Sequence, residues 1–191
     1  MNEAHALSTY PAATEAPASD VADANAASTS DTTCLIVLDD DPTGTQSVAN
    51  LPVLTRWEES DFDWALTQGA PAVYVLTNTR SVDPAEAAQR NREIVTNATA
   101  AATRQNVRLS FVSRGDSTLR GHYPLETDTI AATLLEQSAE AIDAVIIVPA
   151  FPDAGRVTIG GIHYMRCSDG LVPIADMQFA QVATFGYRSS R

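Results

Sequence analysis

The sequence contains no lysine, and this absence argues against functions that need a strongly basic surface. The 12 basic residues are therefore all arginines, and they stand against 24 acidic residues, which gives a formal net charge of −12. A chain of this charge is poorly suited to bind nucleic acid or an anionic membrane surface. It also has no run of about 18 apolar residues that could span a bilayer. The N-terminus lacks the basic and apolar regions of a secretory signal, so we expect a cytoplasmic protein.

Cysteine is also scarce, since the chain has only two. Cys34 and Cys167 lie far apart and form no Cys-x-x-Cys pair, so we expect two buried, reduced thiols and no disulfide. His122 and His163 do not show the spacing of zinc ligands either, and no metal site is predicted. We interpret both histidines as structural residues, with a place at the edge of the site as the alternative for His122, which follows the Arg120-Gly121 turn. His163 lies beside Tyr164 in a β-like segment.

Composition divides the chain near residue 33. Residues 1–33 consist mostly of Ala, Ser, Thr, Asp and Pro and contain almost no large apolar residue. Such a segment cannot bury enough surface to offset the entropy of ordering it, so we expect a disordered acidic tail. Residues 34–191 hold the apolar runs and are expected to form one domain.

Four short apolar runs alternate with helical patterns along this domain. The runs are residues 34–38, 72–76, 107–112 and 144–148. Helices are expected over 57–68, from a cap at Ser81 or Asp83 to about Gln105, and from Pro124 onward. Two β-like segments follow, at 162–165 and 171–174. The alternation predicts an α/β fold with a mostly parallel sheet flanked by helices on both faces, a Rossmann-like arrangement of three layers.

A polar loop containing Gly or Pro follows each of the four runs directly. The carboxyl ends of parallel strands share one edge of a sheet, and ligands bind there, so we expect the four loops to form a site. The adjacent carboxylates of Asp39, Asp40 and Asp41 repel one another, and a cation, arginines or a shared proton must compensate. An alternative is that these loops are ordinary turns whose arginines, such as Arg114 and Arg120, only pair with the nearby acids.

These residue types suit a small polyhydroxy acid as the ligand. An arginine can bind a carboxylate through two parallel hydrogen bonds, and aspartates can accept hydrogen bonds from hydroxyl groups. Glycines in the loops let the backbone approach the ligand closely.

Five loop motifs occur in a fixed order. They are Asp40-Asp41-Pro42-Thr43-Gly44, Thr77-Asn78-Thr79-Arg80, Arg114-Gly115-Asp116-Ser117-Thr118-Leu119-Arg120-Gly121, Pro149-Ala150-Phe151-Pro152 and Gly155-Arg156. In this order they resemble the N-terminal sugar-binding domain of the four-carbon acid sugar kinase family. The resemblance runs from about Leu35 to about Tyr187.

The resemblance implies a role in phosphorylating an acid sugar such as threonate, erythronate or 3-oxo-tetronate with ATP and Mg²⁺. Family chains continue into a C-terminal nucleotide-binding domain, whereas this sequence stops at Arg191. We therefore expect the chain to bind the sugar acid and to be inactive alone, with the nucleotide-binding domain supplied in cis or in trans. Whether the chain forms a homodimer is left open.

The family motifs also select the candidate site residues. Asp41 and Asp116 are the candidates for helping to remove the proton of the attacking hydroxyl. The candidate substrate-binding residues are Asp40, Thr43, Gly44, Arg80, Arg114, Ser117, Arg120, Gly121, Phe151, Gly155 and Arg156.

Two other functions stay open at this point. Asp39-x-Asp41-x-Thr43 after an apolar strand is similar to the nucleophile motif of the haloacid-dehalogenase phosphatases, and Leu76-Thr77-Asn78 is similar to their second motif. In that case Asp39 would be the nucleophile, Asp41 the acid, and Mg²⁺ would lie nearby. The other alternative is a module that binds a small acid without catalysis.

Overall fold

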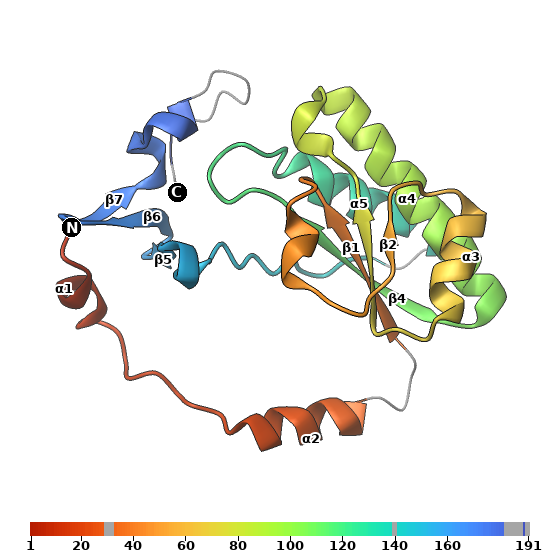
Figure 1. Cartoon of the computed structure of the whole chain (residues 1–191), viewed down its shortest axis with the longest axis horizontal. Helices are drawn as coiled ribbons and strands as arrows, with labels where there is room; N and C mark the ends of the chain where they lie inside the picture. The colour runs from red at the N-terminus through yellow and green to blue at the C-terminus, as the bar shows by residue number, and fades with distance from the viewer. Residues whose placement is uncertain (29–32, 139–140, 182–188, 190–191) are drawn as a thin grey trace. The chain divides into compact units, whose positions relative to one another are not determined.

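The computed structural model describes residues 1–28, 33–138, 141–181 and 189 (Figure 1). The chain divides into two compact units, which are described separately. The larger unit comprises Ser19–Gly115 and His122–Val145. The smaller unit comprises Met1–Ala18, Asp116–Gly121 and Ile146–Arg191.

The larger unit is built on a four-stranded parallel sheet. Its strands are β1 (Thr33–Asp39), β2 (Val53–Leu54), β3 (Ala72–Leu76) and β4 (Arg108–Arg114). The strand order is β2-β3-β1-β4, and all three pairings are parallel. The continuous apolar run of β1 fits its place in the interior of the sheet, where both neighbours are strands. Three of the four predicted strands are thus confirmed, and β2 was not expected because it is only two residues long.

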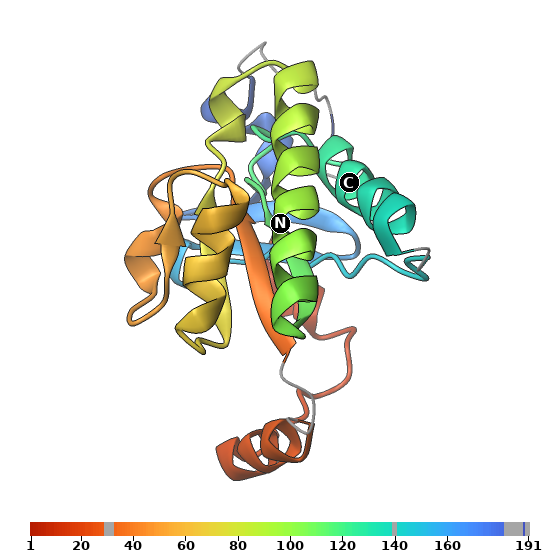
Figure 2. The same cartoon turned by 90° about the vertical axis from the view of Figure 1, so that its right-hand side faces the viewer.

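Three helices cover this sheet. They are α3 (Glu59–Thr67), α4 (Pro84–Gln105) and α5 (Leu125–Ser138), and Figure 2 shows them side by side. The apolar residues of these helices, such as Phe62, Ile94 and Ile130, pack against alternate residues of the strands, such as Ile36 and Val73. Together they form one hydrophobic core. The predicted α/β class, a parallel sheet flanked by helices, is confirmed. This core lies on one face of the sheet, so a further helical layer on the opposite face stays a prediction.

The ends of α4 follow from its terminal residues. The side chain of Asp83 accepts hydrogen bonds from the backbone N–H groups of Ala85 (2.9 Å) and Glu86 (3.0 Å). Pro84 occupies the first turn, where its missing N–H costs nothing. At the other end Asn106 adopts a left-handed conformation with φ 54°, which stops the helix. Of the two caps that the sequence allows, Asp83 is therefore the one in use.

The strand expected at residues 144–148 is wrong. Residues 141–150 have no regular secondary structure, and Ile146 and Val148 are 88 % and 76 % exposed. A strand requires hydrogen bonds to a neighbouring strand, and none of the described strands pairs with this run. Apolar composition alone therefore did not decide the structure of this segment.

The smaller unit contains a three-stranded antiparallel sheet. Its strands are β5 (Arg156–Ile159), β6 (Ile162–Cys167) and β7 (Gly170–Pro173), with β6 in the middle. Gly160 and Gly161 form the two-residue connection from β5 to β6, and both have positive φ, 61° and 77°. That conformation is the one that a tight hairpin turn requires, and glycine adopts it without strain. The two β-like segments of the sequence are confirmed as β6 and β7.

The first residues of the chain add nothing to the core. Helices α1 (Glu3–Leu7) and α2 (Ala18–Ser28) lie in the segment that we expected to be disordered, and no side chain of residues 1–24 is buried. The backbone of Met1 nevertheless pairs with Leu171 of β7, with N···O distances of 2.8 Å in both directions. In the described part of the chain, no helix combines the length and apolarity needed to cross a membrane. Cys34 and Cys167 are both free thiols. Cys34 is buried as predicted, whereas Cys167 is exposed at the end of β6, so its expected burial is wrong.

We expect Asp83→Ala to lower the free energy of unfolding by about 1 kcal/mol, because two N–H groups at the start of α4 lose their acceptor. Ser81→Ala is the matched control, since the Ser81 hydroxyl donates only to the exposed Asn78 carbonyl (2.9 Å). Urea denaturation of both variants measures the difference. A larger loss for Ser81→Ala than for Asp83→Ala would contradict the cap assignment.

Candidate functional site

The carboxyl ends of three parallel strands meet at one edge of the larger unit. Asp39 at the end of β1 lies opposite Leu76 of β3 and Arg114 of β4. The backbone continues this pairing beyond the strands, since Thr77 N–H donates to the Asp39 carbonyl (2.9 Å) and Asp40 N–H to the Arg114 carbonyl (3.3 Å). The starts of the first three predicted loops are therefore brought together, as the parallel sheet requires.

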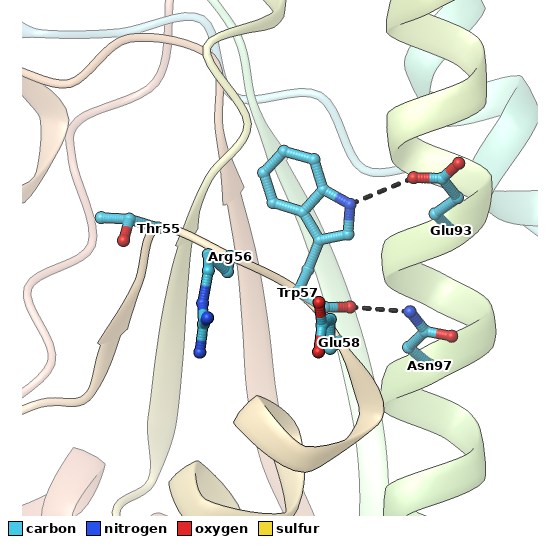
Figure 3. A pocket seen from close by; sticks show the side chains of 6 residues that line it. All are labelled: Thr55, Arg56, Trp57, Glu58, Glu93 and Asn97. Carbon is cyan, nitrogen blue, oxygen red and sulfur yellow. Dashed lines mark hydrogen bonds between the residues drawn. The ribbon is translucent and has the colours of Figure 1, made fainter.

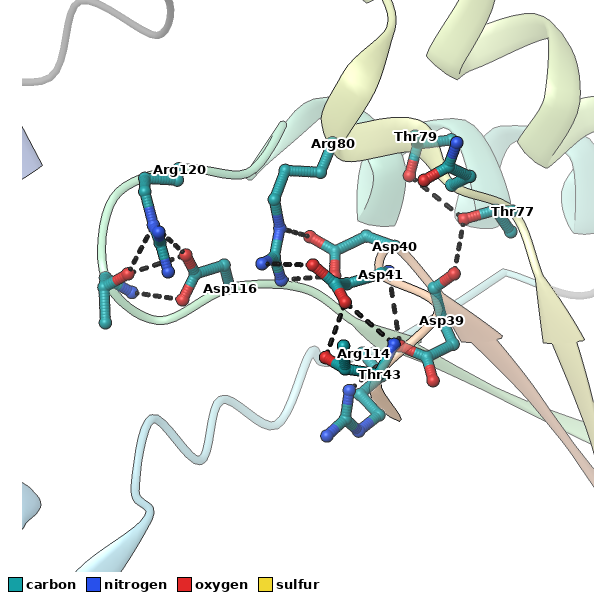
Figure 4. A network of polar contacts seen from close by, with 12 residues as sticks. Asp39, Asp40, Asp41, Thr43, Thr77, Thr79, Arg80, Arg114, Asp116 and Arg120 are labelled. Carbon is teal, nitrogen blue, oxygen red and sulfur yellow. Dashed lines mark hydrogen bonds and ion pairs between the residues drawn. The ribbon is translucent and has the colours of Figure 1, made fainter. Parts of the chain in front are cut away.

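Arg80 neutralises two of the three adjacent carboxylates. It projects from the short 3₁₀ helix η2 (Thr79–Ser81), which begins after Asn78 in a left-handed conformation. Its Nε and Nη2 donate to the two oxygens of Asp40 (3.2 and 2.8 Å), and its Nη1 donates to Asp41 (2.7 Å), as Figure 4 shows. The side chain of Asp40 is 3 % exposed and that of Asp41 is 24 % exposed. Asp41 is thus the more accessible of the two acids.

Asp39 is the buried member of the acidic run. Its carboxylate is fully buried and accepts a hydrogen bond from Arg114 Nη1 (2.9 Å) on Oδ1, whereas Oδ2 has no hydrogen-bond partner. Burial raises the pKa of the Asp39 carboxyl above its usual range, and Arg114 only partly offsets this effect. Of the three ways to compensate the acidic run that the sequence left open, the structure shows arginines, because Arg80 and Arg114 each hold part of it. For Arg114 this is the pairing that the alternative of ordinary turns also predicted.

The turn after β1 is shaped around these carboxylates. Asp41 Oδ1 accepts hydrogen bonds from the backbone N–H (2.8 Å) and the hydroxyl (2.6 Å) of Thr43. Gly44 follows at the start of the 3₁₀ helix η1 (Gly44–Ser47), and its N–H donates to the Asp41 carbonyl (3.0 Å). A Cβ atom at Gly44 would collide with the Asp39 carboxylate and the Arg114 guanidinium. Glycine is required here because the backbone packs directly onto the Asp39–Arg114 pair.

A buried polar network behind this edge fixes the second loop. The Thr79 hydroxyl donates to Glu126 Oε1 of α5 (2.5 Å), and Asn91 of α4 donates to the same oxygen (3.3 Å). His122 Nε2 lies 3.0 Å from the carbonyls of both Thr79 and Val82. This supports the structural interpretation of His122. Sequence reasoning missed Glu126 and Asn91, since a single polar residue in a helical pattern does not reveal what it faces.

The smaller unit contains a second cluster, centred on Asp116. Its carboxylate accepts hydrogen bonds from the backbone N–H of Thr118 (2.9 Å), the Thr118 hydroxyl (2.6 Å) and Arg120 Nε (2.7 Å) (Figure 4). The Asp116 side chain is 3 % exposed. Arg120 also lies over the ring of Phe179, 5.5 Å from its centroid. Asp116 thus organises its own loop, which ends at the buried Gly121.

Arg156 at the start of β5 joins this second cluster. Its Nη1 lies 4.0 Å from Asp116 Oδ1, and its guanidinium lies 6.0 Å from the centroid of the Phe151 ring. Gly155, with φ 74°, ends the 3₁₀ helix η3 (Pro152–Ala154) and leads the chain into β5. The Nε of Arg156 is buried and has no hydrogen-bond partner. Buried donors are rarely left unpaired, so this N–H group marks a place where an acceptor is missing.

The predicted site residues therefore fall into two groups. The larger unit brings together Asp40, Asp41, Thr43, Gly44, Arg80 and Arg114. The smaller unit holds Asp116, Ser117, Arg120, Gly121, Phe151, Gly155 and Arg156. Phe179 was not predicted, and Asp39 was named only in the acidic run and as the nucleophile of the phosphatase alternative. That all four predicted loops form one site stays a prediction.

A separate pocket of about 360 Å³ lies in the larger unit between the segment before α3 and helix α4 (Figure 3). Trp57 lines it, and its indole N–H donates to Glu93 (3.2 Å) while its carbonyl accepts from Asn97 (2.7 Å). None of the predicted site residues lines this pocket, and its charged lining residues are Arg56, Glu58 and Glu93.

The geometry of Asp39 does not favour the phosphatase alternative. An aspartyl nucleophile must reach the phosphorus atom of its substrate with a free carboxylate oxygen. Asp39 is fully buried, and the oxygen without a hydrogen-bond partner lies against Gly44.

Comparison with protein-family models matches residues 35–191 to the sugar-binding N-terminal domain. The match covers both clusters and leaves out only the N-terminal segment. A search of curated proteins found no match.

We expect Gly44→Ala to destabilise the protein by about 1–3 kcal/mol, because the added methyl group displaces the Asp39 and Arg114 side chains. Gly115→Ala is the matched control, since its nearest neighbour would be Glu126 Oε2 at an ordinary 3.8 Å. Thermal or urea unfolding of the two variants provides the measurement. Equal free energies of unfolding for Gly44→Ala and Gly115→Ala would show that the backbone at Gly44 does not pack against the Asp39 carboxylate.

Proposed function

Because the chain belongs to the family of the sugar-binding N-terminal domain of the four-carbon acid sugar kinases, we propose that it binds a four-carbon sugar acid for ATP-dependent phosphorylation. Threonate, erythronate and 3-oxo-tetronate are the substrates that we consider. The family supports a sugar-binding module, and the identity of the acid is our proposal.

One observation carries this proposal: the buried Nε of Arg156 has no acceptor. A guanidinium N–H in this state favours an anionic oxygen, and a hydrogen bond to a charged group contributes about 1.5–3 kcal/mol. Arg120 lies on the same carboxylate of Asp116, so two guanidinium groups border one small region of the smaller unit. In this proposal a sugar carboxylate supplies the missing acceptor. The net charge of −12 does not prevent an anion from binding, because the two nearby guanidinium groups set the local electrostatic field.

Asp41 and Asp116 are our candidates for accepting the proton of the hydroxyl that is phosphorylated. Access separates them, because the side chain of Asp41 is 24 % exposed and that of Asp116 only 3 %. Both carboxylates accept hydrogen bonds from a threonine and an arginine, so these contacts do not separate them. We therefore favour Asp41 for this role and assign Asp116 to holding the arginine in position.

ATP and Mg²⁺ do not fit the residues described here. The described part of the chain has no group of three His, Cys, Asp or Glu side chains that could hold a metal ion. Asp40 and Asp41 are already neutralised by Arg80, and the sequence has no lysine for a phosphate-binding loop. We propose that a C-terminal nucleotide-binding domain, in cis or in trans, supplies the site for both. We also propose that the chain acts in the cytoplasm, without a nucleic-acid or membrane partner.

We expect Arg156→Ala and Arg120→Ala each to weaken binding of the sugar acid by at least about 1.5 kcal/mol, roughly tenfold in Kd. Arg166→Ala is the matched control, because this arginine of the same unit pairs with Glu3 at the exposed start of α1. Isothermal titration calorimetry with threonate, erythronate and 3-oxo-tetronate measures the affinities. If the folded wild type gives no heat with any of the three, the proposed function is wrong.

We expect phosphorylation only when the chain is mixed with a separately expressed nucleotide-binding domain of a four-carbon acid sugar kinase, ATP and Mg²⁺. Release of ADP in a coupled assay measures turnover, and Asp41→Asn should reduce it more than Arg166→Ala. Turnover by residues 1–191 alone would contradict the proposal that another domain supplies the nucleotide site. Mg²⁺-dependent hydrolysis of a generic phosphate ester that is abolished by Asp39→Asn would instead favour the phosphatase.

A further inference from the structure

The ring of His163 connects the β-sheet of the smaller unit to the loop that carries Asp116. His163 is 4 % exposed and lies on β6 opposite Thr158 of β5. Its Nδ1 is 2.9 Å from the hydroxyl of Thr158, and its Nε2 is 3.0 Å from the hydroxyl of Ser117. Both ring nitrogens are therefore used, and one of them reaches a predicted substrate-binding residue.

The hydrogen bonds that link Ser117, His163, Thr158 and Pro149 can have only one direction of donation. The Thr158 hydroxyl lies 2.5 Å from the carbonyl oxygen of Pro149, which has no proton to give. Thr158 must therefore donate its single proton to Pro149, and its oxygen can only accept from His163. Nδ1 of His163 then carries a hydrogen. In a neutral imidazole Nε2 is consequently a bare acceptor, and the Ser117 hydroxyl donates to it.

The surroundings keep this histidine neutral near neutral pH. Burial lowers the pKa of His163, and the positive charge of Arg156 on the paired strand lowers it further. Asp116 and the backbone of Val157, to which the ring donates a hydrogen bond, act in the opposite direction but do not reverse the shift. On the other side of β6, strand β7 carries no titratable side chain, and Asp176 of the 3₁₀ helix η4 (Ile174–Asp176) is exposed to solvent.

We propose that His163 is a positioning residue that turns the Ser117 proton away from the ligand, so that Ser117 accepts a hydrogen bond from a hydroxyl group of the sugar acid. The inference rests on the proposed function, since Ser117 lies beside Asp116 in the loop that the arginines border. A hydroxyl fixed in this way rejects a ligand that presents only an acceptor, such as an oxo group, at this position. His163 thereby favours a hydroxy acid over an oxo acid at the carbon that faces Ser117.

The proton arrangement can be tested without any ligand. In ¹⁵N NMR spectra of the wild-type chain near pH 7, the His163 ring should carry hydrogen on Nδ1 and none on Nε2. The spectrum of His163→Gln assigns the signals, because only His5 and His122 remain. Hydrogen on Nε2, or on both nitrogens, would overturn the proposal. In Thr158→Val, which removes the acceptor but keeps the shape of the side chain, Nδ1 should lose its preference for the proton.

The effect on binding is tested with erythronate and threonate over about pH 5–8. Wild-type affinity should fall toward low pH, because a protonated His163 donates to Ser117 and removes the directed acceptor. His163→Gln, which cannot titrate, should give a flat profile, and His5→Ala, on the exposed helix α1, should keep the wild-type profile. A wild-type profile in His163→Gln would refute the positioning role even if the acid binds.

Ligand analogues identify the hydroxyl group of the acid that donates a hydrogen bond to Ser117. Ser117→Ala should weaken erythronate binding roughly two- to tenfold, the range of one hydrogen bond. One of the two monodeoxy analogues, lacking the hydroxyl at C2 or at C3, should bind the wild type more weakly and be insensitive to Ser117→Ala. Equal sensitivity of both analogues would refute the contact. If the wild type binds no acid while the NMR spectrum shows the expected tautomer, the proposed function fails, and with it the role of Ser117 toward a ligand.

Discussion

The neutralisation of three adjacent aspartates by two arginines is the constraint on which the carboxyl edge of the larger unit depends. Two like charges about 4 Å apart repel by roughly 4 kcal/mol near a protein surface, so the turn from Asp39 to Asp41 needs positive charges to bring its carboxylates this close together. Arg80 binds two of the carboxylates and Arg114 the third. Because these arginines come from the loop after β3 and from the end of β4, charge pairing joins all three strand ends.

Most of the parallel sheet could be predicted from local patterns. The strands β1, β3 and β4 and the helix from Pro84 to Gln105 have bounds that follow from apolar runs, a cap and a proline. The apolar run at 144–148 looks the same in the sequence, yet it has no strand partner in the described structure. Local composition indicates that a segment can form a strand. Whether the strand forms depends on a neighbouring strand with which it can hydrogen-bond.

For the candidate site, residue types were predictable and partners were not. The sequence placed acids and arginines in the same loops, but it did not show that Arg80 binds both Asp40 and Asp41 or that Asp39 is the buried member. His163 was interpreted as structural because it lies beside Tyr164 in a β-like segment. Its hydroxyl partners lie 5 and 46 positions away, at Thr158 and Ser117, and such contacts depend on register and on the path of the chain.

The tight turn at Gly160 and Gly161 has a consequence for the evolution of this sheet. Side chains alternate between the two faces of a strand, so shifting β6 by one residue against β5 would carry the imidazole to the opposite face. The turn has the shortest common hairpin length, and both of its residues hold a backbone conformation that other side chains resist. Insertions or deletions in this hairpin should therefore be far rarer among natural variants than substitutions on its exposed face.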